Sequence, residues 1–130
     1  MSRTLYFYLI LSLIFVACSS DTKQTTNSQS DGKVSLVVFE QELKKNNSPQ
    51  LIDVRTPEEF SKGHLEGAKN INFNAANFEN QISQLDKNQS AFIYCHSGGR
   101  SGKAYKKMKA WGFTKVYDME GGYSAYSKKE

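Results

Sequence analysis

The chain has 130 residues, of which 38% are hydrophobic, so its length fits one compact domain and excludes two full domains. Its formal net charge of +4 arises from 17 Lys and Arg against 13 Asp and Glu. The lysines are scattered and lack interleaved aromatic residues, so we expect no nucleic-acid partner.

The N-terminal segment from Leu5 to Ala17 is an apolar run preceded by Arg3. It has the length of a signal-peptide hydrophobic region and is too short for a comfortable membrane span. The run ends in FVAC at positions 15–18, which resembles the lipoprotein box of bacterial signal peptides. We therefore predict that residues 1–17 are a lipoprotein-type signal peptide and that Cys18 becomes the lipidated mature N-terminus.

This signal predicts a location in a bacterial cell envelope, with the protein lipid-anchored and facing the periplasm or the exterior. An ordinary cleaved secretory signal and an uncleaved N-terminal anchor remain alternatives, and both also export the domain. If Cys18 is acylated, Cys95 is the only thiol left. A disulfide within the chain is then excluded.

We predict that residues 18–32 form a flexible polar tether. No apolar residue occurs from Ser19 to Gly32, so this segment cannot bury surface in a core. A coil of this size has an end-to-end distance on the order of 20 Å. From residue 33 to 130 short apolar runs alternate with polar helical stretches, which predicts one α/β domain with a mainly parallel sheet.

The predicted strands are short apolar runs, namely 34–36, 50–54, 68–71, 91–94 and 115–117. The predicted helices are 38–46, 57–62, 75–85 and 101–111. Thr56 before Pro57 suits a helix cap, and we expect Glu58 and Glu59 to be solvated charges in the first turn of that helix.

The last predicted helix has an apolar face and a basic face. Its apolar residues recur at three- and four-residue spacing, and Gly112 follows as a stop signal. Its basic residues are Lys103, Lys106, Lys107 and Lys109. A solvated helix face is the simpler interpretation, and steering of anionic substrates is the alternative.

The most informative segment is AFIYCHSGGRS at positions 91–101, in which a predicted strand, a glycine-containing loop and a helix follow one another. Gly98 and Gly99 permit backbone angles that turn N–H groups inward, and the helix starting near Ser101 adds its positive end. Together with Arg100 these groups favour a thiolate, so we predict a lowered pKa for Cys95.

The same loop can bind the oxyanion part of a substrate or a persulfide on Cys95, which makes sulfur transfer chemically natural. The alternative is that Cys95 is only a small buried side chain at a strand end. For His96 we favour a solvent-facing or substrate-contacting role over essential catalysis.

Three motifs resemble the rhodanese family. The first is LIDVRTPEEF at positions 51–60 with GHLEGA at 63–68, the second is the loop at 95–101, and the third is EGGYSAY at 120–126. The sequence departs from the family pattern at Leu65, Glu66 and Tyr126, and none of these is the proposed nucleophile.

This resemblance implies a rhodanese-like α/β fold, a five-stranded mainly parallel sheet with helices on both faces. It implies a sulfurtransferase that moves a sulfane sulfur from a donor such as thiosulfate to cyanide or a thiol through a Cys95 persulfide. The anion-binding loop would comprise His96, Ser97, Gly98, Gly99, Arg100 and Ser101.

The resemblance also places Asp53 and Arg55 near that loop as supporting charges, although an ion pair that holds the strand ends is an equally good interpretation. His64 would be a hydrogen-bonded structural histidine. We expect no cofactor and no metal, because two histidines and one mature cysteine show no ligand spacing. We also expect a monomer.

Two other functions are alternatives. The first is a phosphatase or an arsenate reductase: by resemblance, rhodanese-like phosphatases and protein phosphatases have five residues between the cysteine and the arginine, and the four between Cys95 and Arg100 suit a sulfur atom and disfavour a phosphate group. The second is a persulfide carrier without turnover, or a partner-binding module, in the cell envelope.

Overall fold

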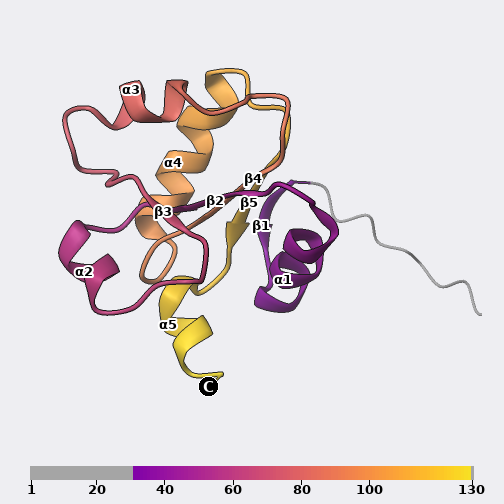
Figure 1. Cartoon of the computed structure of the whole chain (residues 1–130), viewed down its shortest axis with the longest axis vertical. Helices are drawn as coiled ribbons and strands as arrows, with labels where there is room; N and C mark the ends of the chain where they lie inside the picture. Colours follow the sequence, from indigo (N-terminus) through magenta and orange to yellow (C-terminus); the bar gives the residue numbers. More distant parts are fainter. Residues whose placement is uncertain (1–30, 130) are drawn as a thin grey trace, which may run out of the picture.

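The computed structural model describes residues 31–129 (Figure 1). The predicted signal peptide, Cys18 and almost all of the predicted tether lie outside the described residues. The elements in chain order are β1 (Gly32–Val34), α1 (Leu36–Lys45), β2 (Gln50–Asp53), α2 (Pro57–Ser61), β3 (Lys69–Asn70), α3 (Phe78–Ser83), β4 (Ala91–Tyr94), α4 (Gly99–Ala110), β5 (Val116–Met119) and α5 (Gly122–Ser127).

The strands form one five-stranded sheet in the order β1-β5-β4-β2-β3. All four neighbouring pairs are parallel, and in the centre β2 pairs with β4 from Gln50↔Ala91 to Asp53↔Tyr94. Every residue of β4 and β5 is buried. A parallel strand covered on both faces needs apolar residues on both, which explains why β4 reads AFIY without alternation.

Helices cover both faces of the sheet, as predicted. On one face α3 and α4 pack on a core that includes Ile52, Ile93 and Val116. On the other face α1 and α5 pack on a core that includes Phe92 and Tyr117. Figure 1 shows α4 and α1 on opposite sides of the strands. Within residues 31–129 no helix is long and apolar enough to cross a bilayer.

Several predicted boundaries were wrong. The first strand ends at Val34 and its helix begins at Leu36, because the Ser35 side chain accepts a hydrogen bond from the N–H of Val38 and caps the helix. The α3 helix is shorter than its predicted range. The α5 helix was not predicted at all; it has only six residues, follows Gly121 as its cap and starts at Gly122.

The carboxyl ends of the parallel strands meet at one edge of the sheet, where α/β proteins commonly place their sites. Cys95 directly follows β4, and Arg55 comes shortly after β2. The glycine pair Gly121–Gly122 follows β5. The topology therefore brings three separate sequence motifs to the same edge.

Candidate active site

Cys95 lies at the end of β4 with only 1% of its surface exposed. The backbone N–H of Gly98 donates to Cys95 Sγ at 3.1 Å. The hydroxyl of Ser101 lies 3.4 Å from the same sulfur. The sulfur is therefore held between the loop backbone and the first turn of α4.

The loop after Cys95 turns at a single glycine. Gly98 has a φ of +112° and caps α4, and its carbonyl accepts the N–H of Gly102 at 3.0 Å. Gly99 was expected to share this unusual backbone, but it is the first residue of α4 and has no positive φ. His96 and Ser97, between the cysteine and the turn, are exposed.

The pKa of the Cys95 thiol reflects a balance of burial and hydrogen bonding. Burial alone would raise that pKa. The Ser101 hydroxyl and the backbone groups of Ser101, Gly98 and Ser97 outweigh burial, so the pKa of Cys95 is lowered. The predicted direction of the shift is therefore confirmed, and its cause lies mainly in hydrogen bonds.

Arg100 was expected to stabilise the thiolate, but its side chain faces a carboxylate. Its guanidinium binds Glu59 of α2 through two hydrogen bonds of 2.6 and 2.8 Å. Glu59 is thus not a solvated helix charge. The Arg100 hydrogen bonds lower the pKa of Glu59 to about 2, against the opposing effect of burial. The pair links α2 to the start of α4.

Helix α5 holds the other side of the loop. The N–H of Tyr123 donates to the carbonyl of Cys95 at 2.8 Å, and the N–H of Ser124 donates to the carbonyl of His96 at 2.9 Å. Gly122 has a φ of +56°, and a Cβ there would overlap the carbonyl oxygens of Cys95 and His96. Close backbone approach therefore requires the second glycine of the third motif, Gly122.

Asp53 and Arg55 form a buried ion pair, with 2.6 Å between Asp53 Oδ2 and Arg55 Nη2. The same guanidinium donates to the Gly63 carbonyl and lies over the ring of Tyr123, 4.1 Å from its centroid. Within residues 31–129 no hydrogen bond joins either residue to Cys95. The geometry matches the interpretation in which the pair holds strand ends together.

His64 is exposed, and its Nδ1 lies 2.8 Å from the Phe60 carbonyl, with the two rings stacked. This is the structural role that was expected for it. Among residues 31–129 no group of three His, Cys, Asp or Glu side chains is placed to hold a metal ion.

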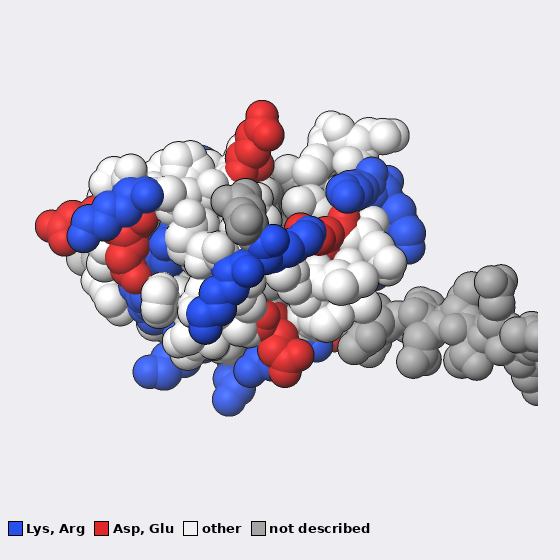
Figure 2. Space-filling view, turned by 90° about the horizontal axis from the view of Figure 1, so that it is seen from below, with Lys and Arg blue, Asp and Glu red and all other residues white. Residues whose placement is uncertain are grey.

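The lysines of α4 are only partly free to act on a substrate. Lys109 pairs with Asp31 at 2.6 Å, and Lys107 lies over the Trp111 ring, 5.6 Å from its centroid. On the face seen in Figure 2, basic and acidic side chains are interspersed. These contacts favour a solvated helix face over a steering surface.

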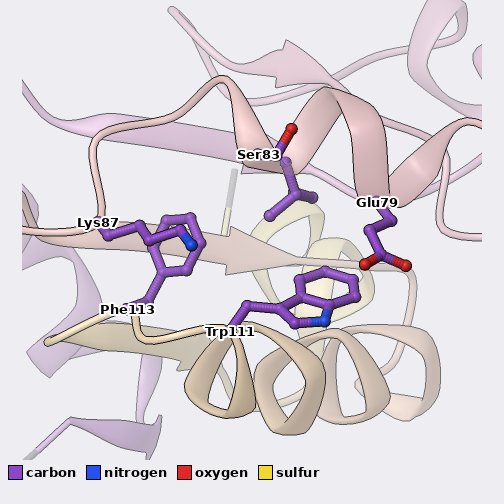
Figure 3. Close-up of a pocket in the computed structure, with 6 residues that line it drawn as sticks. Glu79, Ser83, Lys87, Trp111 and Phe113 are labelled. Carbon is purple, nitrogen blue, oxygen red and sulfur yellow. The ribbon is translucent and has the colours of Figure 1, made fainter.

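A separate hollow of about 140 Å³ lies between α3 and the end of α4 (Figure 3). Its lining residues are Glu79, Ile82, Ser83, Lys87, Trp111 and Phe113. None of them belongs to the cysteine loop, so this hollow is not the site of the proposed chemistry.

A family model described as a rhodanese-like domain matches residues 36–129. The chain belongs to the rhodanese family. The matched span runs from α1 to beyond α5 and includes the whole cysteine loop.

This rhodanese is 41% identical over 87 residues to thiosulfate sulfurtransferase 16 (chloroplastic) of Arabidopsis thaliana, covering 59% of the chain and 72% of that protein. It is 34% identical over 103 residues to the "Putative sulfur carrier protein YrkF" of Bacillus subtilis, covering 79% of the chain. The chain spans about half of that relative, 55% of its length.

The solved structure of the human single-domain sulfurtransferase TSTD1 matches with a TM-score of 0.62 at 25% identity, covering 75% of this chain and 96% of that one. The rhodanese-like α/β fold is thereby confirmed. The names of the relatives support sulfur transfer as the general chemistry of this rhodanese.

Proposed function

We propose that this rhodanese moves a sulfane sulfur from a donor such as thiosulfate to cyanide or a thiol through a persulfide on Cys95. The observation that carries the proposal is the environment of the sulfur. A buried thiol would ordinarily be inert, yet the N–H of Gly98 and the hydroxyl of Ser101 lower the pKa of Cys95.

The first step is attack of the Cys95 thiolate on the outer sulfur of thiosulfate. A new S–S bond forms, the S–S bond of thiosulfate breaks, and sulfite leaves with the electron pair. The persulfide then carries the negative charge that the thiolate carried. The inward N–H groups of the loop can stabilise either anion, so the same loop serves both states.

The second step is attack of cyanide on the terminal sulfur of the persulfide. The S–S bond breaks, thiocyanate leaves and the Cys95 thiolate is restored. Charge is conserved in both steps, and no external oxidant or reductant is needed.

The open side of the loop offers an approach for the donor. A Cβ placed on Gly98 or Gly99 would meet no other atom within 4 Å. The neighbouring His96 and Ser97 side chains are exposed. We infer that the donor anion binds over these four residues and reaches the sulfur from the solvent side.

Intact mass measurement tests this cycle directly. The full chain with Cys18→Ser leaves Cys95 as the only thiol. Incubation with thiosulfate should add the mass of one sulfur atom, and cyanide should then remove it and yield thiocyanate. The same chain with Cys95→Ala is the control. Folded protein with a reactive thiol but neither adduct nor thiocyanate would refute the proposal.

A persulfide carrier that exchanges sulfur only with a partner protein is the second candidate. It is favoured by the resemblance to a protein named as a sulfur carrier. In this case the mass adduct forms from a suitable donor, while turnover with cyanide matches that of the Cys95→Ala control. The adduct and the turnover rate together separate the two candidates.

For the N-terminal segment we propose lipidation at Cys18 after removal of residues 1–17, with the domain anchored in the bacterial cell envelope as a monomer. The support is the FVAC sequence at positions 15–18. Expression of the full chain in a bacterium, followed by mass analysis of the mature N-terminus, tests this. An unmodified Cys18, or an intact Met1, would refute it.

A further inference from the structure

Arg100 carries the permanent positive charge of the cysteine loop, and that charge is already bound. The next residue, Ser101, lies 3.4 Å from Cys95 Sγ through its hydroxyl, so the backbone of Arg100 lies beside the sulfur. The Arg100 guanidinium points instead to α2, where Nη1 and Nη2 donate to the two carboxylate oxygens of Glu59 at 2.6 and 2.8 Å. Two parallel bonds of this kind fix the geometry of both partners.

Glu59 is itself held by the start of its own helix. Its Oε2 accepts from the backbone N–H and from the hydroxyl of Thr56, both at 3.1 Å. The N–H of Glu59 donates in return to the Thr56 hydroxyl at 3.3 Å, which completes a capping box. The carboxylate cannot swing away without breaking these contacts. Glu59 is therefore a fixed anchor for Arg100.

The one other arginine in the part of the chain that the structure describes is balanced in the same way. Arg55 pairs with Asp53, and the two side chains are 3% and 0% exposed. The side chains of His96 and Lys103 are exposed, so water and salt screen any charge that they carry. The charge that a donor meets at close range is therefore the negative charge of the Cys95 thiolate.

Uncharged groups hold this negative charge. They are the N–H of Gly98 and the hydroxyl of Ser101, both in contact with Cys95 Sγ. They can stabilise one charge, on the thiolate or on the persulfide. A second negative charge on the donor would approach the thiolate with no free cation to offset the repulsion. Thiosulfate carries two negative charges, whereas an organic persulfide or thiosulfonate carries one.

Arg100 nevertheless lies within electrostatic reach of the sulfur. Its hydrogen bonds with Glu59 are the main cause of its raised pKa, and the charges of Glu59 and Cys95 add to the rise. Without the Glu59 carboxylate, the guanidinium would be an unbalanced positive charge at the start of α4. Such a charge would attract a doubly charged donor more strongly than a singly charged one.

On the basis of the proposed function, we propose that Glu59 is a positioning residue that binds Arg100 and so makes the site prefer sulfane donors with one negative charge. Organic persulfides and thiosulfonates form this class. With a thiosulfonate, the Cys95 thiolate attacks the outer sulfur, a new S–S bond forms and the S–S bond of the donor breaks. A sulfinate leaves with the electron pair, so charge is conserved and nothing else is consumed.

Two matched donors test this preference. Methanethiosulfonate differs from thiosulfate by a methyl group in place of one charged oxygen, and both offer a terminal sulfur. The rate constant for sulfur loading onto Cys95 is measured by intact mass on the full chain with Cys18→Ser. The intrinsic reactivity of the donors is the same for every variant, so a change in the ratio of the two rate constants reports the site. Glu59→Gln should raise the rate with thiosulfate by about tenfold relative to methanethiosulfonate, the order expected for one unbalanced charge near a partly exposed site.

Glu58→Gln is the matched control, because it removes an equal charge from an exposed position of the same helix without freeing Arg100. It should leave the ratio unchanged. Adding Arg100→Gln to Glu59→Gln should restore the ratio of the unmodified pair, since the net charge of the two side chains is then zero again. An unchanged ratio in Glu59→Gln would overturn the proposal. So would an equal change in Glu58→Gln, or a double variant that keeps the full gain.

A measurement on the Cys18→Ser chain alone covers the case in which Glu59→Gln does not fold. Above about 0.1 M salt, charges farther apart than about 10 Å are largely screened, so the salt dependence reports the local charge. The loading rate should rise with added salt, more steeply with thiosulfate than with methanethiosulfonate, because like charges repel. A thiosulfate rate that falls with salt would show a free cation at the site and overturn the proposal.

The two proposals fail in distinguishable ways. If neither donor loads sulfur onto Cys95, the sulfur-transfer cycle is refuted and the donor preference with it. If both donors load sulfur but the ratio ignores Glu59, only the role of Glu59 is refuted.

Discussion

The backbone N–H of Tyr123 donates to the carbonyl of Cys95 at 2.8 Å, so the proposed nucleophile is held by a helix from the third motif of the chain. This contact exists because Gly122 lets α5 approach the loop backbone. The third motif thus helps to determine where the cysteine loop lies.

Gly122→Ala should therefore disturb both stability and activity. The added Cβ overlaps the carbonyls of Cys95 and His96, in addition to a left-handed backbone cost of about 1–2 kcal/mol. Gly67→Ala is the matched control, because Gly67 has a φ of +77° and open space around it. The free energy of unfolding in urea and the rate of thiocyanate formation should both fall further in Gly122→Ala than in Gly67→Ala. Equal decreases in the two variants would show that the overlap with the loop carbonyls has no effect.

Ser101→Ala should raise the pKa of Cys95, because it removes a hydrogen bond that favours the thiolate. The rate of alkylation of the Cys18→Ser chain should then reach half of its plateau at a higher pH. Ser83→Ala, an exposed hydroxyl on α3, is the control and should leave the profile in place. If both variants give the unmodified profile, the hydroxyl does not stabilise the thiolate.

Glu59→Gln should lower stability at neutral pH by about 1 kcal/mol, since the broken pair is partly exposed. The pKa of Glu59 is about 2 when folded, against an ordinary value of 4.5. A lowered folded pKa stabilises the protein above 4.5, and this contribution is lost as the pH falls to about 2.

Urea unfolding at a series of pH values checks this. The free energy of unfolding of the unmodified chain should exceed that of Glu59→Gln at neutral pH. This difference should shrink between pH 4.5 and about 2. Glu58→Gln, an exposed carboxylate on the same helix, serves as the control. A difference from Glu59→Gln that stays constant over this range would show that the ion pair does not contribute.

Asp53→Asn should reduce stability by about 3 kcal/mol or more, because it leaves the buried guanidinium of Arg55 without its counter-charge. The alkylation rate of Cys95 in the protein that remains folded should stay near that of the unmodified chain. A large change in that rate with unchanged urea stability would instead make Asp53 a supporting charge of the cysteine loop.

Much of this molecule could be predicted from local sequence. The run AFIY before Cys95 predicted a strand, which the structure shows buried along its whole length, and Thr56 was expected to cap the helix that begins at Pro57, as it does. These features depend on residues within one helix or strand. The hydrophobic pattern and the capping residues of a single element are visible in the local sequence.

The features that were missed depend on contacts between distant segments. Glu59 and Arg100 are 41 positions apart in the sequence, so no local pattern predicts their ion pair. Helix α5 has too few residues to show a helical period. Asp118, a buried residue of β5, did give one signal in the sequence, because it is an acidic residue flanked by apolar residues inside a strand. Acidic side chains are rarely fully buried unless they are paired.

The burial of Cys95 limits which molecules can touch its sulfur. With 1% of the residue exposed, a folded protein surface cannot reach the bare thiolate, so two copies cannot join through a disulfide at this position without opening the loop. A persulfide extends the side chain by one S–S bond of about 2 Å. In the proposed cycle the transferred sulfur would therefore lie one bond farther from the backbone than Cys95 Sγ, so an acceptor too bulky to reach the thiolate could still take it.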